Sequence, residues 1–268
     1  MILILKPFNL FIAASEVHKL ELPKAEQCLW KGSSRGWLVQ LEDSPSINLI
    51  NPLTSTRMQL PPLTTFPNVL EYIPERIGSE YSVMMLKMKL FSLVQMKHFC
   101  IKKLVLSSSP KGKNCIAMAI YGDCNKLAWC RIGDEGWKTV EGGWCFIDDI
   151  IHFDGKFYAL DYTGTLIILP DEEVGASCPK ATLFAKPPNP DEPDFASDNL
   201  YLVESSGELL MVDRIIESGW KKFDTTVGFE STGLLQDPRL INILYYGIET
   251  SKHVVIKEVR VEFMLSAT

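Results

Sequence analysis

The sequence predicts an all-β chain, because three observations agree. Short runs of alternating apolar residues recur along its 268 residues, separated by turns that contain glycine or asparagine. Helical periodicity is weak, and one or two helical turns are expected only within residues 71–94. The composition is that of a folded globular protein, with 46% hydrophobic and 22% charged residues. Consecutive hairpins are therefore the expected architecture.

Four copies of one unit are visible, each a set of short apolar runs joined by tight turns. They cover residues 36–63, 101–140, 149–169 and 199–223. In the third copy, Asp154-Gly155 separates two apolar runs, which is a strong short-range signal for a hairpin. The fourth copy ends in Gly219-Trp220-Lys221, which repeats Gly136-Trp137-Lys138 of the second. The copies are expected to pack on one another, since none is large enough to be stable alone.

Units of short antiparallel strands with an aromatic residue near the last strand are typical of β-propeller blades. The expected fold class is a β-propeller-like array of four-stranded antiparallel blades with little helix, and whether the array is complete stays open. Residues 186–194 are rich in proline and are expected to form a stiff loop between blades. After Glu230 the rhythm changes, although residues 241–246 and 254–263 still have strand patterns. This tail either supplies a closing strand or does not pack on the array.

Charge and hydropathy exclude several classes of partner. The net charge of −6 and the sequence pI of about 5.4 disfavour binding to nucleic acid. The apolar stretch 83–94 is shorter than the roughly 20 residues that span a bilayer, so no membrane association is expected. Lys6-Pro7 interrupts the apolar N-terminus, which argues against a signal peptide. Seven cysteines, an odd number, indicate a reducing compartment, the cytoplasm and/or the nucleus.

Linear motifs for catalysis or metal binding are not found in the sequence. His98 and Cys100, or Cys124 and Cys130, lack the spacing of zinc ligands. No nucleophile elbow and no phosphate-binding loop occurs. We therefore expect no catalytic residue, no metal and no cofactor.

An enzyme remains the alternative, because propeller enzymes assemble their sites from several blades and leave no linear motif. His152, Asp154 and Asp161 would support a hydrolase or lyase if they converged on one pocket. Their positions at strand ends and turns favour a structural role instead.

Tryptophans are candidate anchors for a protein partner, since they concentrate binding energy at interfaces. Trp37, Trp137 and Trp220 recur at equivalent positions and are expected to pack between sheets. Trp144 differs, because two glycines precede it in a link between two predicted strands. The predicted protein-binding patch consists of Trp144, Asp148, Asp149 and Tyr162.

Seven stretches of the chain follow the pattern of one known family. They are residues 17–23, 32–39, 49–63, 103–110, 119–122, 149–161 and 201–204. In them the chain resembles the plant F-box proteins whose C-terminal part is the domain of unknown function 295, the KIB-type β-propeller. The resemblance extends over roughly residues 15–230 and agrees with the hairpin pattern.

The resemblance implies a domain organisation. Residues 1–24 form an N-terminal segment, residues 25–230 the KIB-type propeller, and residues 231–268 a divergent tail with strand-like segments. An F-box docks on the Skp1-type adaptor of a cullin ubiquitin ligase, and nothing before Val17 resembles one. A truncated or alternatively spliced member of the family is therefore expected.

The resemblance also implies a function. The chain is expected to be a non-catalytic propeller that binds an unknown protein client, like the substrate-recognition part of an F-box ubiquitin ligase subunit. A Skp1-type adaptor is the partner expected for the family, but without an F-box this chain would be uncoupled from the ligase. A third possibility is that the chain is a degenerate member of the family. Its propeller ring would then be unable to close, and it would aggregate through exposed strand edges.

Overall fold

The computed structural model describes most of the chain as antiparallel β-structure. The described residues are 3–6, 9–12, 28–112, 114–170, 179–186, 200–205, 207–217, 225–233, 241–250 and 253–263. Side chains are described for residues 28–112, 114–169, 179–186, 200–205 and 207–212. The predicted all-β class is confirmed, since strands dominate and the described residues contain a single α-helix.

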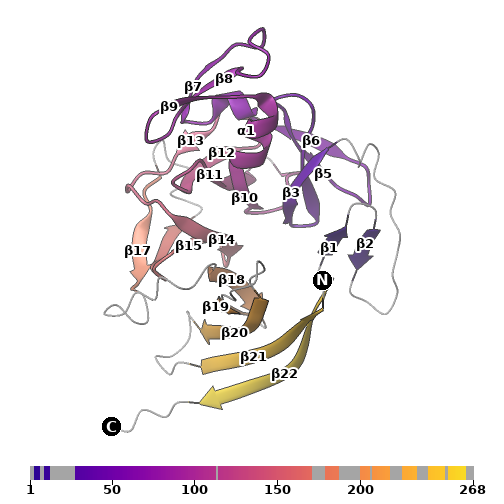
Figure 1. The fold of residues 1–268 in the computed structure, drawn as a ribbon, viewed down its shortest axis with the longest axis vertical. Helices are drawn as coiled ribbons and strands as arrows, with labels where there is room; N and C mark the ends of the chain where they lie inside the picture. The colour runs from indigo at the N-terminus through magenta and orange to yellow at the C-terminus, as the bar shows by residue number, and fades with distance from the viewer. Residues whose placement is uncertain are drawn as a thin grey trace. The chain divides into compact units, whose positions relative to one another are not determined.

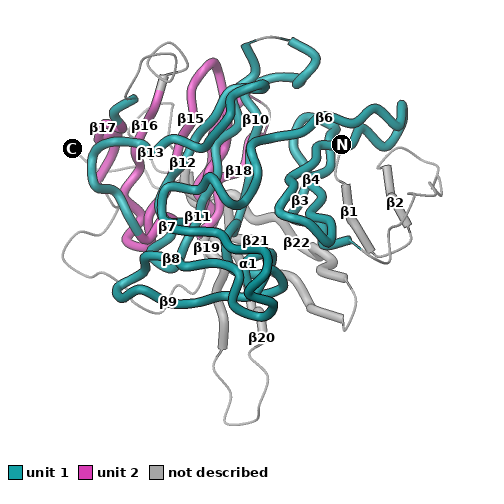
Figure 2. Tube along the Cα trace, turned by 90° about the horizontal axis from the view of Figure 1, so that it is seen from above, with its two compact units in different colours: residues 1–145, 171–180 teal, residues 146–170, 181–268 magenta. Residues whose placement is uncertain are grey.

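Two compact units divide the chain (Figure 2). Unit 1 comprises residues 1–145 and 171–180, and unit 2 comprises residues 146–170 and 181–268. Each unit is built from consecutive antiparallel sheets, so neighbours in the sequence are also neighbours in each sheet.

Unit 1 contains a two-stranded ribbon and three larger sheets, named I, II and III (Figure 1). The ribbon pairs β1 (Leu3–Lys6) with β2 (Asn9–Ile12). Sheet I consists of β3 (Leu29–Ser34), β4 (Trp37–Leu41), β5 (Ile47–Ile50) and β6 (Arg57–Leu60). Sheet II consists of β7 (Val69–Tyr72), β8 (Tyr81–Met84) and β9 (Met88–Phe91). Sheet III consists of β10 (Ile101–Leu106), β11 (Ile116–Tyr121), β12 (Lys126–Arg131) and β13 (Lys138–Thr139).

Unit 2 contains two sheets, named IV and V. Sheet IV consists of β14 (Ile147–Phe153), β15 (Lys156–Asp161), β16 (Leu166–Pro170) and β17 (Thr182–Ala185). Sheet V consists of β18 (Leu200–Ser205), β19 (Glu208–Glu217), β20 (Thr225–Gly233), β21 (Ile241–Thr250) and β22 (His253–Phe263). The strand patterns at 241–246 and 254–263 are thus confirmed, and both strands extend sheet V.

Turn chemistry sets the register of these hairpins. Asp154 and Gly155 join β14 to β15 with φ angles of 45° and 68°. Two successive positive φ angles define the type I′ turn, whose twist matches that of the flanking strands. The predicted Asp154-Gly155 hairpin is therefore confirmed, with Phe153 paired to Lys156.

The sequence predicted one or two helical turns within residues 71–94, and this prediction is wrong for most of that segment. The three strands of sheet II occupy residues 69–91, and the helix α1 (Leu93–Phe99) begins only at the end of the window. The helix starts there because Ser92 forms a capping box: its hydroxyl accepts a bond from the Gln95 N–H (3.2 Å), and its own N–H donates to the Gln95 side chain (2.8 Å). Sheet II is consequently an additional unit beyond the four copies visible in the sequence.

The core of unit 1 is one hydrophobic cluster to which sheets I, II and III all contribute. Trp137 joins the three: its ring stacks on Phe66 with centroids 4.7 Å apart, and its indole N–H donates to the Pro61 carbonyl at 2.9 Å. Trp37 and Trp137 are 1% and 5% exposed, which confirms that they pack in the interior. Trp220 and residues 187–194 of the predicted loop lie outside the described residues.

Replacing Trp137 by phenylalanine is expected to lower the free energy of unfolding by about 1–3 kcal/mol, because the buried Pro61 carbonyl loses its donor. Trp129→Phe is the matched control, since the buried Trp129 indole nitrogen has no hydrogen-bond partner among the described residues. Urea unfolding followed by circular dichroism measures both. If the two variants lost the same free energy of unfolding, the hydrogen bond of Trp137 would not contribute to stability.

Candidate functional site

The four residues of the predicted patch fall in different environments. Trp144 belongs to unit 1 and is partly buried in the link after β13. Asp148, Asp149 and Tyr162 belong to unit 2. The register shifts between Ile147 and Asp149, so Asp148 is the extra residue of a bulge in β14 and is partly buried.

Asp149 has a structural position rather than a surface one. It is 3% exposed, and its two carboxylate oxygens accept backbone hydrogen bonds. The Ile150 N–H donates to one oxygen at 2.9 Å, and the Leu202 N–H donates to the other at 2.8 Å. Leu202 lies in β18, so this carboxylate joins sheets IV and V within unit 2. A buried carboxylate held by charge-assisted bonds serves the fold and offers no surface to a partner.

Tyr162 is the exposed member of the predicted patch, and Phe146, which the sequence reasoning missed, lies against it. The two rings meet edge to face with centroids 5.8 Å apart, and they are 46% and 49% exposed. The Tyr162 N–H also donates to the Phe146 carbonyl at 3.1 Å. Phe146 has a φ of 58°, a strained conformation for a bulky residue that persists only where the surroundings impose it. An exposed aromatic pair is therefore held at the start of unit 2.

The turn that carries Tyr162 is internally bonded. One Asp161 carboxylate oxygen accepts hydrogen bonds from the N–H of Thr163 (2.9 Å), the hydroxyl of Thr163 (2.6 Å) and the N–H of Thr165 (2.9 Å). Such an Asx-type turn restricts the backbone locally. Tyr162 is thus presented in a preformed position, which lowers the entropy cost of binding.

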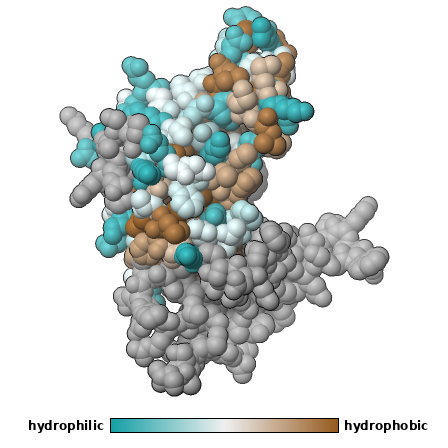
Figure 3. Space-filling view, turned by 90° about the vertical axis from the view of Figure 1, so that its left-hand side faces the viewer, coloured by the Kyte–Doolittle hydropathy of each residue, from teal (hydrophilic) through white to brown (hydrophobic). Residues whose placement is uncertain are grey.

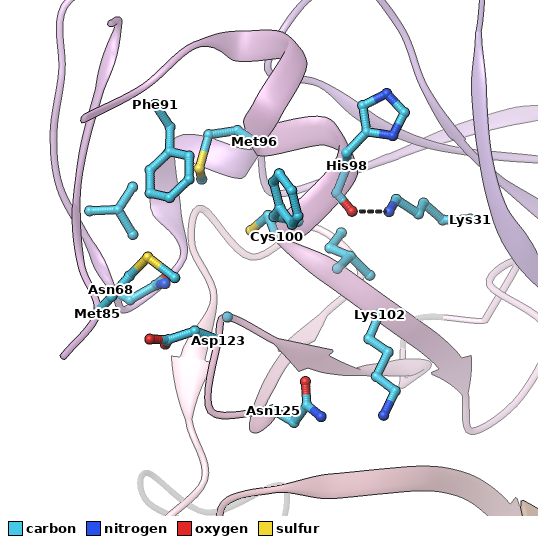
Figure 4. Close-up of a pocket in the computed structure, with 14 residues that line it drawn as sticks. Lys31, Asn68, Met85, Phe91, Met96, His98, Cys100, Lys102, Asp123 and Asn125 are labelled. Atoms are coloured by element: carbon cyan, nitrogen blue, oxygen red, sulfur yellow. Dashed lines mark hydrogen bonds between the residues drawn. The ribbon is translucent and has the colours of Figure 1, made fainter. Parts of the chain in front are cut away.

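A separate feature is a cavity of about 370 Å³ in unit 1 (Figure 4). It lies between sheet II, helix α1 and the turn that joins β11 to β12. Its lining combines apolar and polar side chains and includes Met85, Phe91, Met96, Cys100 and Asp123. Volume and composition suit a small ligand or one inserted side chain of a partner.

Two lysines fix the last turn of helix α1 beside this cavity. The Lys31 ammonium donates to the His98 carbonyl at 2.7 Å, in the last turn of the helix, where a positive charge is favourable. The buried Lys97 reaches the exposed Asp43 with a nitrogen–oxygen distance of 2.6 Å, and Asp43 lies in the turn between β4 and β5. Burial lowers the pKa of Lys31, while nearby Cys100 raises it.

The floor of the cavity requires a glycine. Gly122 has a φ of 72°, and a Cβ placed there would lie 3.3 Å from the side-chain nitrogen of Asn68. Its N–H donates to the Cys100 carbonyl at 3.0 Å, which fixes the turn against the end of α1. A larger residue at 122 would be strained and would displace the cavity wall.

The Cys100 thiol that lines the cavity is not an activated nucleophile. Burial raises the pKa of the Cys100 thiol to about 12, and the nearby Lys31 lowers it only in part. The thiolate is the reactive form of cysteine, so this thiol is inert near neutral pH.

The alternative acid/base group does not assemble. His152 pairs with Phe157 on β15, whereas Asp161 pairs with Ile147 at the opposite end of the hairpin. Four residues of β-strand separate the two positions, about 13 Å at roughly 3.3 Å per residue. The His152 ring instead packs edge to face on Phe157 at 4.8 Å between centroids. His152, Asp154 and Asp161 therefore do not share one pocket.

Two further searches cover only the described part of the chain. No three His, Cys, Asp or Glu side chains in it are close enough to hold a metal ion. No helix in that part has the length and apolar composition needed to cross a membrane.

Consecutive antiparallel sheets, three of them four-stranded in the described residues, are the architecture of a β-propeller-type domain. The chain belongs to the KIB1-4 beta-propeller family, whose pattern matches residues 8–254.

Three similar curated proteins come from Arabidopsis thaliana, and all are described as F-box proteins. F-box protein SKIP23 is 29% identical over 198 residues, which cover 70% of this chain and 44% of that protein. A second is 32% identical over 134 residues, or 50% of this chain and 33% of the relative. A third is 26% identical over 226 residues, or 78% of this chain and 50% of the relative. The chain thus spans half or less of the length of these relatives.

Cysteine reactivity tests the environment of the cavity. In the folded chain, iodoacetamide is expected to modify the partly exposed Cys124 and Cys145 well before the buried Cys100, with modified peptides identified by mass spectrometry. Cys100 should react at the same rate as the others once the chain is unfolded in urea. Early modification of Cys100 would contradict its buried, protonated state.

The raised pKa of Cys100 also predicts a pH dependence of stability. An unfolded thiol ionises near 9.0, whereas the folded thiol stays protonated to about 12. The contribution of the neutral Cys100 thiol to the free energy of unfolding is therefore complete below pH 9.0. It is lost as the pH rises from 9.0 toward about 12, because the thiol then ionises in the unfolded chain but not in the folded one. Cys100→Val should lose less stability across this window than the unmodified chain, measured by urea unfolding at each pH.

Proposed function

We propose that this chain is a non-catalytic module that recognises a protein client, as the substrate-recognition part of an F-box ubiquitin ligase subunit does. Membership of the KIB1-4 beta-propeller family and similarity to F-box proteins support this proposal. In an F-box ligase the transfer chemistry belongs to other subunits, so a recognition domain needs a surface rather than an active site. The proposed location is the cytoplasm and/or the nucleus, in keeping with seven cysteines of which the six described are free.

The exposed pair of Phe146 and Tyr162 is the observation that carries the proposal. Aromatic side chains dominate the energetics of protein interfaces, especially where they are held rigidly. Here the Asp161 turn and the strained backbone of Phe146 hold both rings before any client binds. The pair therefore replaces Asp149 in the predicted patch, and Tyr162 is retained.

Binding through this pair can be separated from folding by substitution. Phe146→Gly should leave the free energy of unfolding within about 1 kcal/mol, because relief of the positive φ offsets the added chain entropy. Combined with Tyr162→Ala, it should reduce client recovery at least about tenfold. Tyr201→Ala is the matched control, since Tyr201 is a half-exposed aromatic residue of the same unit outside the pair.

The measurement is affinity purification of the tagged chain from plant cells, with quantitative mass spectrometry of each variant. A protein recovered with the parent chain and with Tyr201→Ala, but not with the double variant, is the expected client. Recovery that is equal for all three chains would contradict the role of the pair. A Skp1-type adaptor and a cullin in the same samples would show attachment to the ligase, and their absence beside a recovered client would show recognition uncoupled from it.

A further inference from the structure

Sheet II lacks a strand that three other sheets possess. Sheets I, III and IV each have four strands, whereas sheet II ends at β9. The fourth strands of those sheets are short, with 4, 2 and 4 residues in β6, β13 and β17. Among the described residues, none pairs with the outer side of β9. An open position of about the length of these short strands therefore exists at this edge.

The direction of the backbone groups follows from two hydrogen bonds between β8 and β7. The Met84 N–H donates to the Asn68 carbonyl at 2.7 Å, and the Ile73 N–H donates to the Glu80 carbonyl at 2.8 Å. Residues at even positions of β8 thus direct their backbone groups toward β7. In an antiparallel sheet, the alternate residues then bond to the strand on the other side.

The alternate residues of β8 pair with Phe91 and Lys89 of β9. By the same alternation, the N–H and C=O groups of Met88 and Leu90 point away from β8 toward the open edge. These groups are available to an added strand, which could form main-chain bonds without disturbing the existing ladder.

The side chains around the edge have a regular pattern. Met84, Met88 and Leu90 share one face of sheet II and are 48%, 61% and 54% exposed. Hydrophobic surface appears over sheet II at the upper right of Figure 3. Lys89 lies on the opposite face, and Lys87 immediately precedes the strand, both exposed. No carboxylate among the described residues forms an ion pair with either lysine.

We propose that the open edge of β9 binds an extended acidic segment of a partner protein as a fourth strand of sheet II. Its backbone bonds to Met88 and Leu90. Side chains of an added strand alternate between the two faces, so apolar residues lie beside Met88 and Leu90 while acidic residues lie beside Lys87 and Lys89. The segment therefore has alternating apolar and acidic residues.

This site is independent of the aromatic pair. It belongs to unit 1, whereas Phe146 and Tyr162 belong to unit 2. The competing explanation is that Lys87 and Lys89 only prevent unwanted strand pairing, as lysines on exposed edges commonly do. The two explanations differ in whether an acidic strand binds.

The probe is a short fluorescent peptide of alternating valine and glutamate with blocked termini, titrated with the full chain by fluorescence anisotropy. The matched peptide has lysine in place of glutamate. The chain should bind the glutamate peptide and not the lysine peptide.

Lys87→Glu combined with Lys89→Glu should weaken binding of the glutamate peptide at least about tenfold and permit binding of the lysine peptide. Lys111→Glu with Lys126→Glu makes the same change of net charge at exposed positions elsewhere in unit 1 and should bind like the parent chain.

Leu90→Pro tests the backbone bonds. It removes an N–H that points outward, so the ladder to β8 is kept and circular dichroism should show a folded chain. Binding of the glutamate peptide should be lost in this variant and kept in Leu90→Val. The proposal is overturned if the parent chain does not bind the glutamate peptide, if charge reversal leaves the preference unchanged, or if Leu90→Pro binds normally. Concentration-dependent dimers that Leu90→Pro abolishes, without peptide binding, would assign the edge to a second copy of the chain.

Discussion

The contact of Trp137 with Pro61 and Phe66 is the interaction on which the framework of unit 1 depends. No single sheet of this size buries enough apolar surface to be stable alone, so each must be fixed against its neighbours. Trp137 lies just before β13, and its indole donates to a carbonyl 76 residues earlier, at the end of sheet I. Its ring covers Phe66, which also lies 5.3 Å from Tyr121 between ring centroids. One side chain thereby joins the end of one sheet, the start of the next and the core of the third.

This mode of construction determines where a partner can bind. Sheets that pack face to face bury the side chains of their strands and leave turns, links and outer edges in contact with solvent. In unit 1, helix α1 contacts the turn after β4 through the ion pair of Lys97 and Asp43, and it borders the cavity with the turn after β11. In unit 2, the turn after β15 carries Tyr162. Within each unit, turns therefore carry the exposed or cavity-bordering side chains, while the strands supply the framework.

The sequence predicted those features that local chemistry determines. The Asp154-Gly155 hairpin was predictable because only a few residue pairs accept two positive φ angles, and the burial of Trp37 and Trp137 followed from their recurrence in the pattern. Sheet II was not predicted, because the apolar residues Met88 and Leu90 of β9 are exposed and their pattern does not mark a buried face. The Ser92–Gln95 capping box was a readable signal for the start of α1.

The candidate site was less predictable, because tertiary contacts decide it. Asp149 has the pattern of a solvated acid, yet it bonds to the Leu202 backbone 53 residues later in the chain. Nothing in the sequence indicates the positive φ of Phe146, since such a conformation in a bulky residue is imposed by its surroundings. Tyr162 lies in a turn of Asp, Thr and Gly, so its exposure follows from the local sequence.

Electrostatics bears on whether an acidic segment can reach the edge of β9 at all. The chain has a net charge of −6, so its overall field repels an acidic partner at long range. At physiological ionic strength, however, exposed charges act over about 8 Å, and the local potential beside β9 then reflects Lys87 and Lys89 rather than the whole chain. Exposed ion pairs contribute little individually, so the lysines select the partner's charge while backbone bonds and the apolar face provide most of the affinity. Moderate salt should for this reason favour the acidic strand by reducing the long-range repulsion before it weakens the local attraction.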